Sequence, residues 1–404
     1  MMNKDKKRLL FVISYLHIGG AERALAEITR NLPKEWEIDI LLNGNQPIEF
    51  EYRGNLLFLG IDEKPKMASV FFHAKILYRR LVTMRKLKRS GKYMACISFL
   101  DSANVANILT KTGKCKTIIS VRNSLKNKAM LPQYKYIVNP LVKMLYNKAD
   151  WIVAVSRGLG SELIEHFSLR KDKVVVIENG YDIEQLNELG KQEIEKELSA
   201  FLDNKKVITT VGRLTDAKGQ WHIIRAFSEL AAKMDNVVLM LVGGGKSEGY
   251  LREVVNCLGL NDKVFFVGTT KNPYKYVSKS DVFVLSSLFE GFPNAMAEAI
   301  CLGIPCVATD FQTGARELLA PSLIEDKEPI KQLTHAEFGV ITPCCSGNKL
   351  LDEPLEAEEV ELSKAMYELL NNDGMRAHYA QMSRECRLDL GIDRIVKKYE
   401  EIIL

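Results

Sequence analysis

The sequence lacks the features that mark membrane-spanning, secreted and zinc-binding proteins. No apolar run reaches the roughly 18 to 20 residues that span a bilayer. The start, "MMNKDKKRLLFVIS", has a basic flank but no small-residue cleavage site. The eight cysteines form no C-x-x-C pair, and no histidines accompany them at zinc spacing. We therefore expect a cytoplasmic protein with reduced thiols, in which only the adjacent Cys344 and Cys345 leave a soft-metal site open.

Acidic residues are almost absent from residues 64–149. This stretch holds 19 Lys and Arg but one acid, Asp101, whereas the whole chain has a net charge of only +5. Residues 1–150 contain 27 basic and 12 acidic residues, and the rest of the chain is acidic in balance. The asymmetry indicates that the first half meets an anionic partner. No nucleic-acid-binding motif accompanies the charge, so we expect no nucleic acid among its partners.

The dinucleotide fingerprint G-x-G-x-x-G is also missing, which argues against a dehydrogenase. The first apolar run leads instead into "SYLHIGGAERAL", with Gly19 and Gly20 at the start of a helical pattern. Glycines at a helix N-terminus let the backbone approach an anionic ligand closely. A phosphate site and an ordinary tight turn are equally compatible with this pair. His17, just before it, is most simply a loop histidine.

Strand-like and helical segments alternate along the chain, which predicts an α/β protein with parallel sheets. The alternation pauses in a polar stretch from about 183 to 204 and restarts with "KVITTVG". A chain of 404 residues exceeds one ordinary core. We predict two doubly wound Rossmann-like domains over residues 1–190 and 191–389, with ligands in the cleft at the carboxyl ends of their strands. The helix over 390–404 can pack back on either domain, and we assign it to the first.

The stretch "VGRLTDAKG" places Arg213 and Lys218 in the loop after the first strand of the second domain. A guanidinium grips phosphate oxygens in pairs and an ammonium adds a compact charge, so together they can hold a diphosphate. Two solvated surface cations are the alternative. Position alone does not choose between them.

Two acids, Glu290 and Glu298, flank Pro293 in the otherwise uncharged stretch "SLFEGFPNAMAEAICLGIPC". Proline suits the first turn of a helix, so we expect a helix from about Phe292 with the amides of Asn294 and Ala295 unpaired. Both carboxylates can then accept hydrogen bonds from sugar hydroxyls. Alternatively, Glu290 caps the helix and Glu298 pairs with a cation.

These segments resemble a known family. "EGFPNAMAE" is similar to the E-x7-E signature of retaining, nucleotide-sugar-dependent glycosyltransferases of family four, which have the GT-B fold of two facing Rossmann-like domains. "GGAER", "VSRG", "ENGYD", "VGRLTDAKG", "LVGGG" and "FVGTT" occur in the family's order. The resemblance extends from about residue 8 to 345. Each motif is modest, but the ordered set is highly specific.

The resemblance implies roles for individual residues. Arg213 and Lys218 would bind the donor diphosphate and stabilise the leaving group, and Glu290 would bond the transferred sugar. Glu298 would hold the ribose. Further donor contacts would come from the glycines Gly19, Gly20 and Gly268 and from the segment Phe292, Pro293, Asn294 and Ala295. Gly268 would border the base.

The resemblance also implies the reaction chemistry. No D-x-D motif is present to hold Mg²⁺, so we expect neither a metal nor another cofactor, and a UDP-sugar donor rather than a GDP-sugar. Retention without an enzymic nucleophile implies front-side attack. Where many members have a histidine, this chain has Arg122, which, like Asp101, is a candidate contact for the acceptor or the sugar.

The basic half predicts where the acceptor is met. Residues 68–92 and 127–148 combine apolar residues with Lys and Arg, so they can lie on an anionic bilayer or simply form solvated helices. We favour a protein peripheral to the inner face of the plasma membrane. Its acceptor would be a glycan or polyprenyl-diphosphate-linked glycan in bacterial capsule, O-antigen or exopolysaccharide assembly. A sugar-nucleotide epimerase on the same scaffold and a non-catalytic binding protein are the alternatives.

Overall fold

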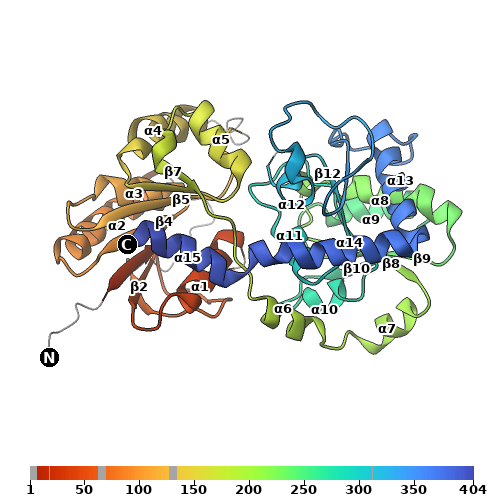
Figure 1. Ribbon diagram of the computed structural model, residues 1–404, viewed down its shortest axis with the longest axis horizontal. Helices are drawn as coiled ribbons and strands as arrows, with labels where there is room; N and C mark the ends of the chain where they lie inside the picture. Colours follow the sequence, from red (N-terminus) through yellow and green to blue (C-terminus); the bar gives the residue numbers. More distant parts are fainter. Residues whose placement is uncertain (1–6, 18, 62–69, 127–133, 312) are drawn as a thin grey trace. The chain divides into compact units, whose positions relative to one another are not determined.

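The computed structural model describes residues 7–17, 19–61, 70–126, 134–311 and 313–404, with the backbone alone at 70, 71 and 73 (Figure 1). The chain divides into two compact units, Met1–Gly180 with Ile392–Leu404, and Tyr181–Gly391. The division therefore lies at Gly180 rather than near residue 190. Among the described residues no helix combines the length and the apolar character needed to cross a bilayer.

The first unit is built on a seven-stranded parallel sheet in the order β3-β2-β1-β4-β5-β6-β7. Its strands are β1 Arg8–Val12, β2 Glu37–Leu42, β3 Asn55–Phe58, β4 Ala95–Phe99, β5 Lys116–Val121, β6 Trp151–Ala154 and β7 Val174–Val176. Side chains alternate between the faces of a strand, so Leu9 and Phe11 of β1 enter one core and Leu10 and Val12 the other. Both faces are therefore buried, as the apolar strands predicted.

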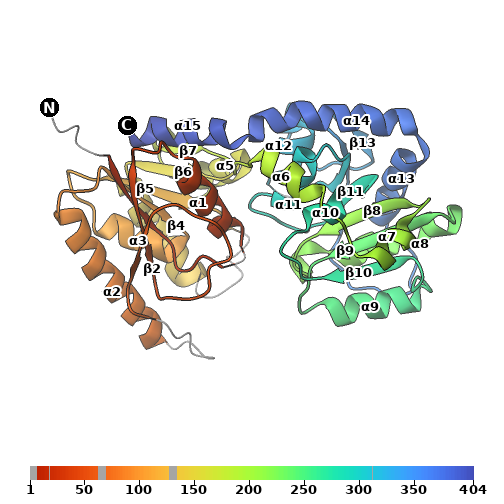
Figure 2. The same cartoon turned by 90° about the horizontal axis from the view of Figure 1, so that it is seen from below.

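Helices cover both faces of this sheet (Figure 2). They are α1 Gly20–Asn31, α2 Val70–Arg89, α3 Asp101–Leu109, α4 Asn139–Leu145, α5 Arg157–Glu165 and α15 Ile392–Ile403. α1 and α15 contribute to the core of Leu9, whereas α2 and α3 contribute to the core of Leu10. Ile395 and Tyr399 of α15 are fully buried there, so the last helix is an integral part of the first unit.

The second unit also has a seven-stranded sheet, in the order β10-β9-β8-β11-β12-β14-β13. Its strands are β8 Lys206–Val211, β9 Val237–Val242, β10 Val264–Gly268, β11 Val282–Leu285, β12 Cys306–Thr309, β13 Thr334–His335 and β14 Val340–Thr342. All neighbours are parallel except β13, an antiparallel edge strand. Its helices are α6 Ile183–Gly190, α7 Lys196–Leu202, α8 Gln220–Lys233, α9 Glu248–Cys257, α10 Tyr274–Val277, α11 Asn294–Cys301, α12 Ala315–Leu319, α13 Ala357–Asn371 and α14 Asp373–Cys386.

The prediction of two doubly wound α/β units is confirmed, with two local corrections. The polar stretch 183–204 is not a plain connection, because most of it forms α6 and α7. Both helices bury leucine side chains, including Leu186 in α6 and Leu198 in α7. The short strands β13 and β14 were also unexpected, since a run of three residues such as Val340–Thr342 gives little periodicity to detect.

Candidate active site

The loop between β8 and α8 carries both predicted diphosphate ligands. It contains a 3₁₀ turn, Asp216–Lys218, followed by Gly219 with φ of 57° in the left-handed region. A Cβ on Gly219 would lie 2.6 Å from the carbonyl oxygen of Ser286, so only glycine fits. The Ser286 hydroxyl donates to the Gly219 carbonyl at 2.8 Å, and the Leu288 amide to that of Ala217 at 2.9 Å. The loop after β8 is thus fastened to the loop after β11.

This fastening brings Lys218 against Glu290. The Lys218 ammonium and a Glu290 carboxylate oxygen are in contact, and both side chains are mostly buried. The Ser287 hydroxyl also donates to Glu290, at 2.8 Å. A third loop joins the site, because the Thr313 hydroxyl donates to the Glu290 carbonyl. Residues after β8, β11 and β12 therefore meet at the carboxyl edge of the sheet, where ligands of such sheets bind.

Arg213 lies in the same loop but is placed differently. Its side chain is exposed, and its guanidinium makes no hydrogen bond or ion pair with the described residues. Lys218 folds back along this loop, its Cε 3.4 Å from where a Cβ on Gly212 would lie. Both cations thus belong to one short segment at the strand end. Arg213 is open to a ligand, whereas Lys218 already has a carboxylate partner.

The rim beside Arg213 is formed by glycine backbone. Gly243, after β9, has no room for a Cβ because the Gly212 carbonyl occupies that space, and its amide donates to the Gly268 carbonyl at 2.9 Å. Gly268 has φ of 81°, and nothing described lies within 4 Å of where its Cβ would be. Gly268 is the last residue of β10, at the same edge of the sheet.

The helix that carries Glu298 begins two residues later than expected. Pro293 is the N-cap of α11, and Asn294 is its first residue. The Asn294 amide is not unpaired as predicted, because it donates to the Phe292 carbonyl at 2.9 Å in a tight turn. Its side-chain oxygen accepts from the Tyr181 hydroxyl at 2.7 Å. Glu298 is buried, so this acid does not reach bulk solvent.

Four predicted residues lie in the first unit. Gly19 is the N-cap of α1 and Gly20 its first residue, as expected. Asp101 does not end a strand but begins α3, where it accepts from the Tyr134 hydroxyl at 3.1 Å. Arg122 is buried; its guanidinium contacts the Asn179 side chain and lies over the Phe99 ring, 5.5 Å from the centroid. Arg122 thus has internal partners that its position in the sequence did not reveal.

The cationic helix α2 has a more limited exposed face than the sequence suggested. Arg80 and Lys88 are buried, with hydrogen bonds to neutral partners such as Asn43 Oδ1 and Asn107 Oδ1, both at 2.6 Å. Most of its apolar residues pack on the core. Its exposed side chains larger than alanine form one helical stripe, which we call the α2 stripe: Lys75, Tyr78, Val82, Arg85, Lys86 and Arg89.

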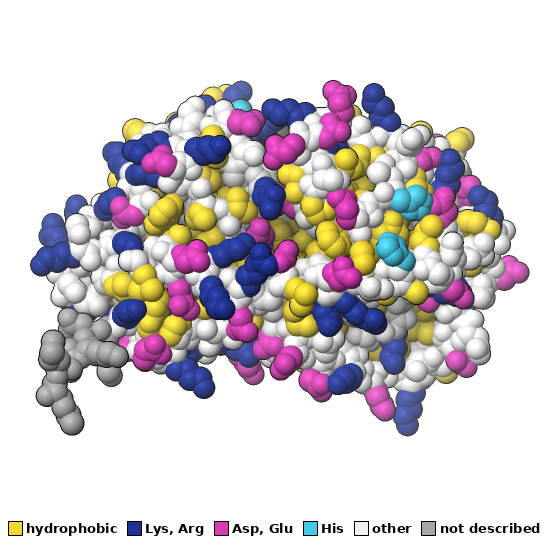
Figure 3. All heavy atoms as spheres, viewed as in Figure 1, with side chains coloured by type: hydrophobic (Ala, Val, Ile, Leu, Met, Phe, Trp, Pro, Cys, Tyr) yellow, Lys and Arg dark blue, Asp and Glu magenta, His cyan; other side chains and the backbone are white. Residues whose placement is uncertain are grey.

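In Figure 3, basic side chains gather at the left edge of the molecule, over the region of α2 in Figure 1. Of the first predicted membrane segment, residues 68 and 69 lie outside the described residues. The second predicted segment is described only from Tyr134 onward, because 127–133 also lie outside them. In it, Tyr136, Ile137 and Met144 are exposed.

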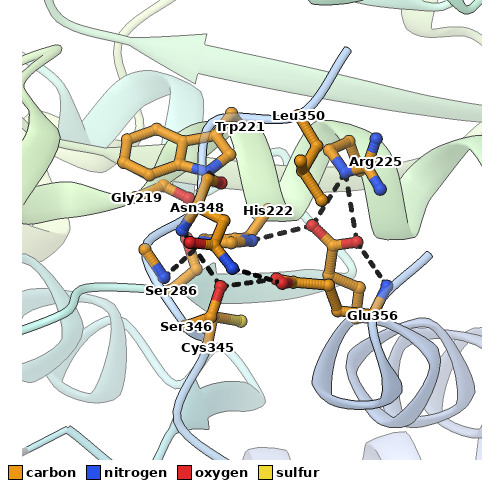
Figure 4. Close-up of polar contacts among 12 residues, drawn as sticks. Gly219, Trp221, His222, Arg225, Ser286, Cys345, Ser346, Asn348, Leu350 and Glu356 are labelled. Atoms are coloured by element: carbon orange, nitrogen blue, oxygen red, sulfur yellow. Dashed lines mark hydrogen bonds and ion pairs between the residues drawn. The ribbon is translucent and has the colours of Figure 1, made fainter. Parts of the chain in front are cut away.

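A buried polar cluster, which we did not predict from the sequence, holds the start of α8, next to the β8–α8 loop (Figure 4). Arg225 Nε of α8 bonds both carboxylate oxygens of Glu359, at 2.9 and 3.1 Å, and all these side chains are inaccessible to solvent. His222 Nε2 accepts from the Gly347 amide at 3.3 Å. His222 Nδ1 therefore carries the proton and donates to Glu359 at 2.7 Å. The neutral imidazole fixes the segment after β14 against the start of α8.

Three residues of this cluster, His222, Glu356 and Glu359, are close enough together to hold a metal ion. Their ligand atoms already have protein partners, however, since Glu356 accepts from Ser346 and Asn348 at 2.6 and 2.8 Å. The Arg225 charge also opposes a cation there. We regard the cluster as structural. Burial likewise raises the pKa of Cys344 to about 11, which leaves it a protonated thiol and a poor metal ligand.

Two units, each built on a largely parallel seven-stranded α/β sheet, are the architecture of the GT-B class of glycosyltransferases. Residues 18–185 match the family "Glycosyltransferase Family 4", and residues 191–325 match "Glycosyl transferases group 1". The chain belongs to glycosyltransferase family four.

Named relatives and solved structures agree with this assignment. An uncharacterised glycosyltransferase of Methanocaldococcus jannaschii, MJ1059, is 32% identical over 81% of this chain and 83% of its own. The N-acetylgalactosamine-N,N'-diacetylbacillosaminyl-diphospho-undecaprenol 4-alpha-N-acetylgalactosaminyltransferase of Campylobacter jejuni is 30% identical over 76% and 82%. The crystal structure of Anabaena Alr3699/HepE in complex with UDP covers 98% of both chains, with a TM-score of 0.72 and 18% identity, and supports the fold.

The buried cluster predicts an acid-sensitive stability. Burial tends to raise the pKa of Glu359, but hydrogen bonds from His222 and Arg225 outweigh it and hold the pKa below its usual value. A carboxylate with a lowered pKa stabilises the fold above its unfolded-state pKa, near 4.3, and this stability is lost as pH falls through the lower folded-state value. Glu359→Gln should cost about 3 kcal/mol at pH 7, because Arg225 loses its counterion. The deficit should shrink toward acid pH.

The measurement is urea unfolding of the full chain between pH 3 and pH 8. Glu229→Gln is the matched control, because Glu229 makes an exposed ion pair with Lys233 on the same α8 helix. That pair should be worth roughly 0.3–0.5 kcal/mol. Equal effects of the two substitutions at pH 7 would contradict the role given to the cluster.

Proposed function

We propose that the chain is a retaining glycosyltransferase that moves a hexose or N-acetylhexosamine from a nucleotide diphosphate sugar, preferably a UDP-sugar, to a glycan or polyprenyl-diphosphate-linked acceptor. The contact of Lys218 with Glu290 at the carboxyl edge of the second sheet is the observation that carries the proposal. The UDP named in the Anabaena complex supports the choice of base. The diphospho-undecaprenol acceptor in the name of the Campylobacter relative supports a lipid-linked acceptor in polysaccharide assembly.

The donor's charges and hydroxyls match the chemistry of this edge. The exposed, planar guanidinium of Arg213 donates paired hydrogen bonds to phosphate oxygens, and the Lys218 ammonium adds a positive charge in the same loop. Glu290 accepts from hydroxyls of the transferred sugar. Because Glu290 already accepts from Ser287 and contacts Lys218, its carboxylate is held in place before the sugar arrives. Glu298 of α11 takes the ribose, and Gly268 borders the base.

Transfer then needs charge stabilisation rather than a nucleophile from the protein. As the glycosidic bond breaks, negative charge grows on the departing diphosphate, where Arg213 and Lys218 stabilise it. The acceptor hydroxyl attacks from the same side and gives its proton to the departing phosphate oxygen, which preserves the anomeric configuration. Both named relatives are glycosyltransferases, which favours transfer over the epimerase alternative.

The acceptor is assigned to the first unit and to an anionic membrane surface. The α2 stripe holds four basic residues with Tyr78 and Val82 among them, and Val82 is 52% exposed. Cationic side chains attract anionic headgroups, and neighbouring apolar side chains can enter the headgroup boundary. α3 contacts both α2 and α4, so the stripe and the exposed residues near α4 belong to one helical layer. This surface favours peripheral attachment at the inner face of the plasma membrane.

Loss of the Lys218 charge should abolish most of the catalysis. Lys218→Met should lower the rate of sugar transfer or donor hydrolysis by about 10²- to 10³-fold, because removal of one charge-stabilising donor costs roughly 2.7–4 kcal/mol. A panel of UDP and GDP sugars, with release of nucleoside diphosphate as the readout, measures this. Lys233→Met, at the far end of α8, is the control and should keep full activity. Comparable rates for the two variants, or conversion of donor alone to an isomer, would refute the proposal.

Transfer should persist without divalent metal. The cationic pair neutralises the diphosphate, so the rate in excess EDTA should equal the rate in added Mg²⁺. The same assay, run on protein dialysed against chelator, decides this. A rate that collapses in EDTA and returns with Mg²⁺ would show that a metal shares the leaving-group charge.

Binding to liposomes should depend on the α2 stripe. Each basic residue contributes about 1 kcal/mol at best, so Arg85→Gln with Lys86→Gln should weaken binding to anionic vesicles by roughly one to two orders of magnitude at low salt. Cosedimentation with vesicles of phosphatidylglycerol and phosphatidylcholine measures it. Lys171→Gln with Lys191→Gln removes the same charge from exposed sites elsewhere and is the control. Equal binding of both double variants would count against the stripe.

A further inference from the structure

Tyr181 stands where the chain enters the second unit. It directly follows Gly180, the last residue of the first unit before the crossing, and it is 1% exposed. Its amide donates to the Leu390 carbonyl at 2.9 Å, and it forms an isolated parallel bridge with Gly391. Gly391 is the last residue of the second unit before the chain returns. The backbone of Tyr181, where the chain enters the second unit, is therefore hydrogen-bonded to the segment at which the chain leaves it.

The side chain of Tyr181 reaches the candidate active site. Its hydroxyl donates to Asn294 Oδ1 at 2.7 Å, across 113 residues of sequence. Asn294 is the first residue of α11 and lies midway along the chain between Glu290 and Glu298. One partly buried hydrogen bond thus connects the start of the second unit to the turn between the two predicted sugar-binding acids.

The residues after Tyr181 strengthen this connection. The Asp182 side chain caps α6 by accepting from the Gln185 amide at 2.9 Å. α6 then packs against both α10 and α11. The backbone at Tyr181 and directly after it is consequently held, so the ring has little freedom to follow Asn294 if that residue moves. Such a rigid partner is what precise placement of a ligand-binding turn requires, since displacements near 1 Å cost large factors in rate.

We propose that Tyr181 is a positioning residue, whose hydroxyl orients Asn294 and with it the first turn of α11 toward the donor nucleotide sugar. This inference rests on the proposed function, because it takes the edge around Glu290 as the donor site. Tyr181 itself need not touch the donor. The hydroxyl group, rather than the aromatic ring, is the part of the side chain that performs the role.

Tyr181→Phe in the full-length chain isolates the hydroxyl and keeps the buried ring. Titration with UDP, or with GDP if that nucleotide binds instead, should show affinity reduced roughly 2- to 12-fold, the range for loss of one hydrogen bond. Tyr276→Phe is the matched control: Tyr276 is also buried in the second unit, and its hydroxyl contacts one carboxylate, Glu195, at 2.9 Å. The control should lose comparable thermal stability but bind nucleotide as the parent does.

A double-mutant cycle with Asn294→Ala separates positioning from general stability. In that background Tyr181→Phe should have no further effect on nucleotide affinity, because the hydrogen bond to Asn294 is already gone. Additive effects, or parent-like affinity of Tyr181→Phe, would overturn the inference while leaving the proposed function intact. Failure of the parent chain to bind either nucleotide would instead overturn the proposed function and this inference with it.

Discussion

The close approach of two loops, where Gly219 lies under the Ser286 carbonyl, is the constraint on which the rest of the candidate site depends. A side chain at Gly219 would force the loops after β8 and β11 apart, since its Cβ would lie 2.6 Å from that oxygen. The Ser286 hydroxyl and the Leu288 amide then lock the loops together at 2.8 and 2.9 Å. Lys218 and Glu290 meet because they flank this junction on either side. Charge and carboxylate are therefore placed by backbone packing and not by their mutual attraction alone.

The segment between β14 and α13 reinforces the same junction through contacts with the start of α8. His222, three residues beyond Gly219, holds the Gly347 amide, and Trp221 Nε1 donates to the Asn348 carbonyl at 2.7 Å. A Cβ on Gly347 would lie 3.0 Å from Leu288, in the loop that leads to Glu290. Arg225 and Glu359 are costly to desolvate, but together they satisfy each other in a dry interior. We infer that these contacts of Glu359 with His222 and Arg225 fix the start of α8.

Local sequence sufficed for much of the fold and for placing Lys218 and Glu290 after strands of the same sheet. Apolar strands such as Val237–Val242 are unambiguous because both faces of a parallel sheet are buried. Lys218 and Glu290 were predicted together because each comes after such a strand. The partnership of His222 with Glu359 spans 137 residues, and nothing in either neighbourhood indicates it. Arg80 and Lys88 illustrate the same limit: both read as surface charges on a cationic helix, yet in the core they donate hydrogen bonds to the neutral side-chain oxygens of Asn43 and Asn107.

Burial of those two cations changes the strength that a membrane contact can have. Four basic residues remain on the α2 stripe, and at about 1 kcal/mol each they supply roughly 4 kcal/mol, or a factor near 10³ in partitioning. Even a single acyl chain, with a partition constant near 10⁴ M⁻¹, anchors a protein only marginally. Attachment through this stripe would therefore be reversible and weakened by salt. Under the proposed function, a lipid-linked acceptor would add attraction only while it is bound, so an enzyme held this loosely would find its acceptor at the bilayer and leave once the sugar has been transferred.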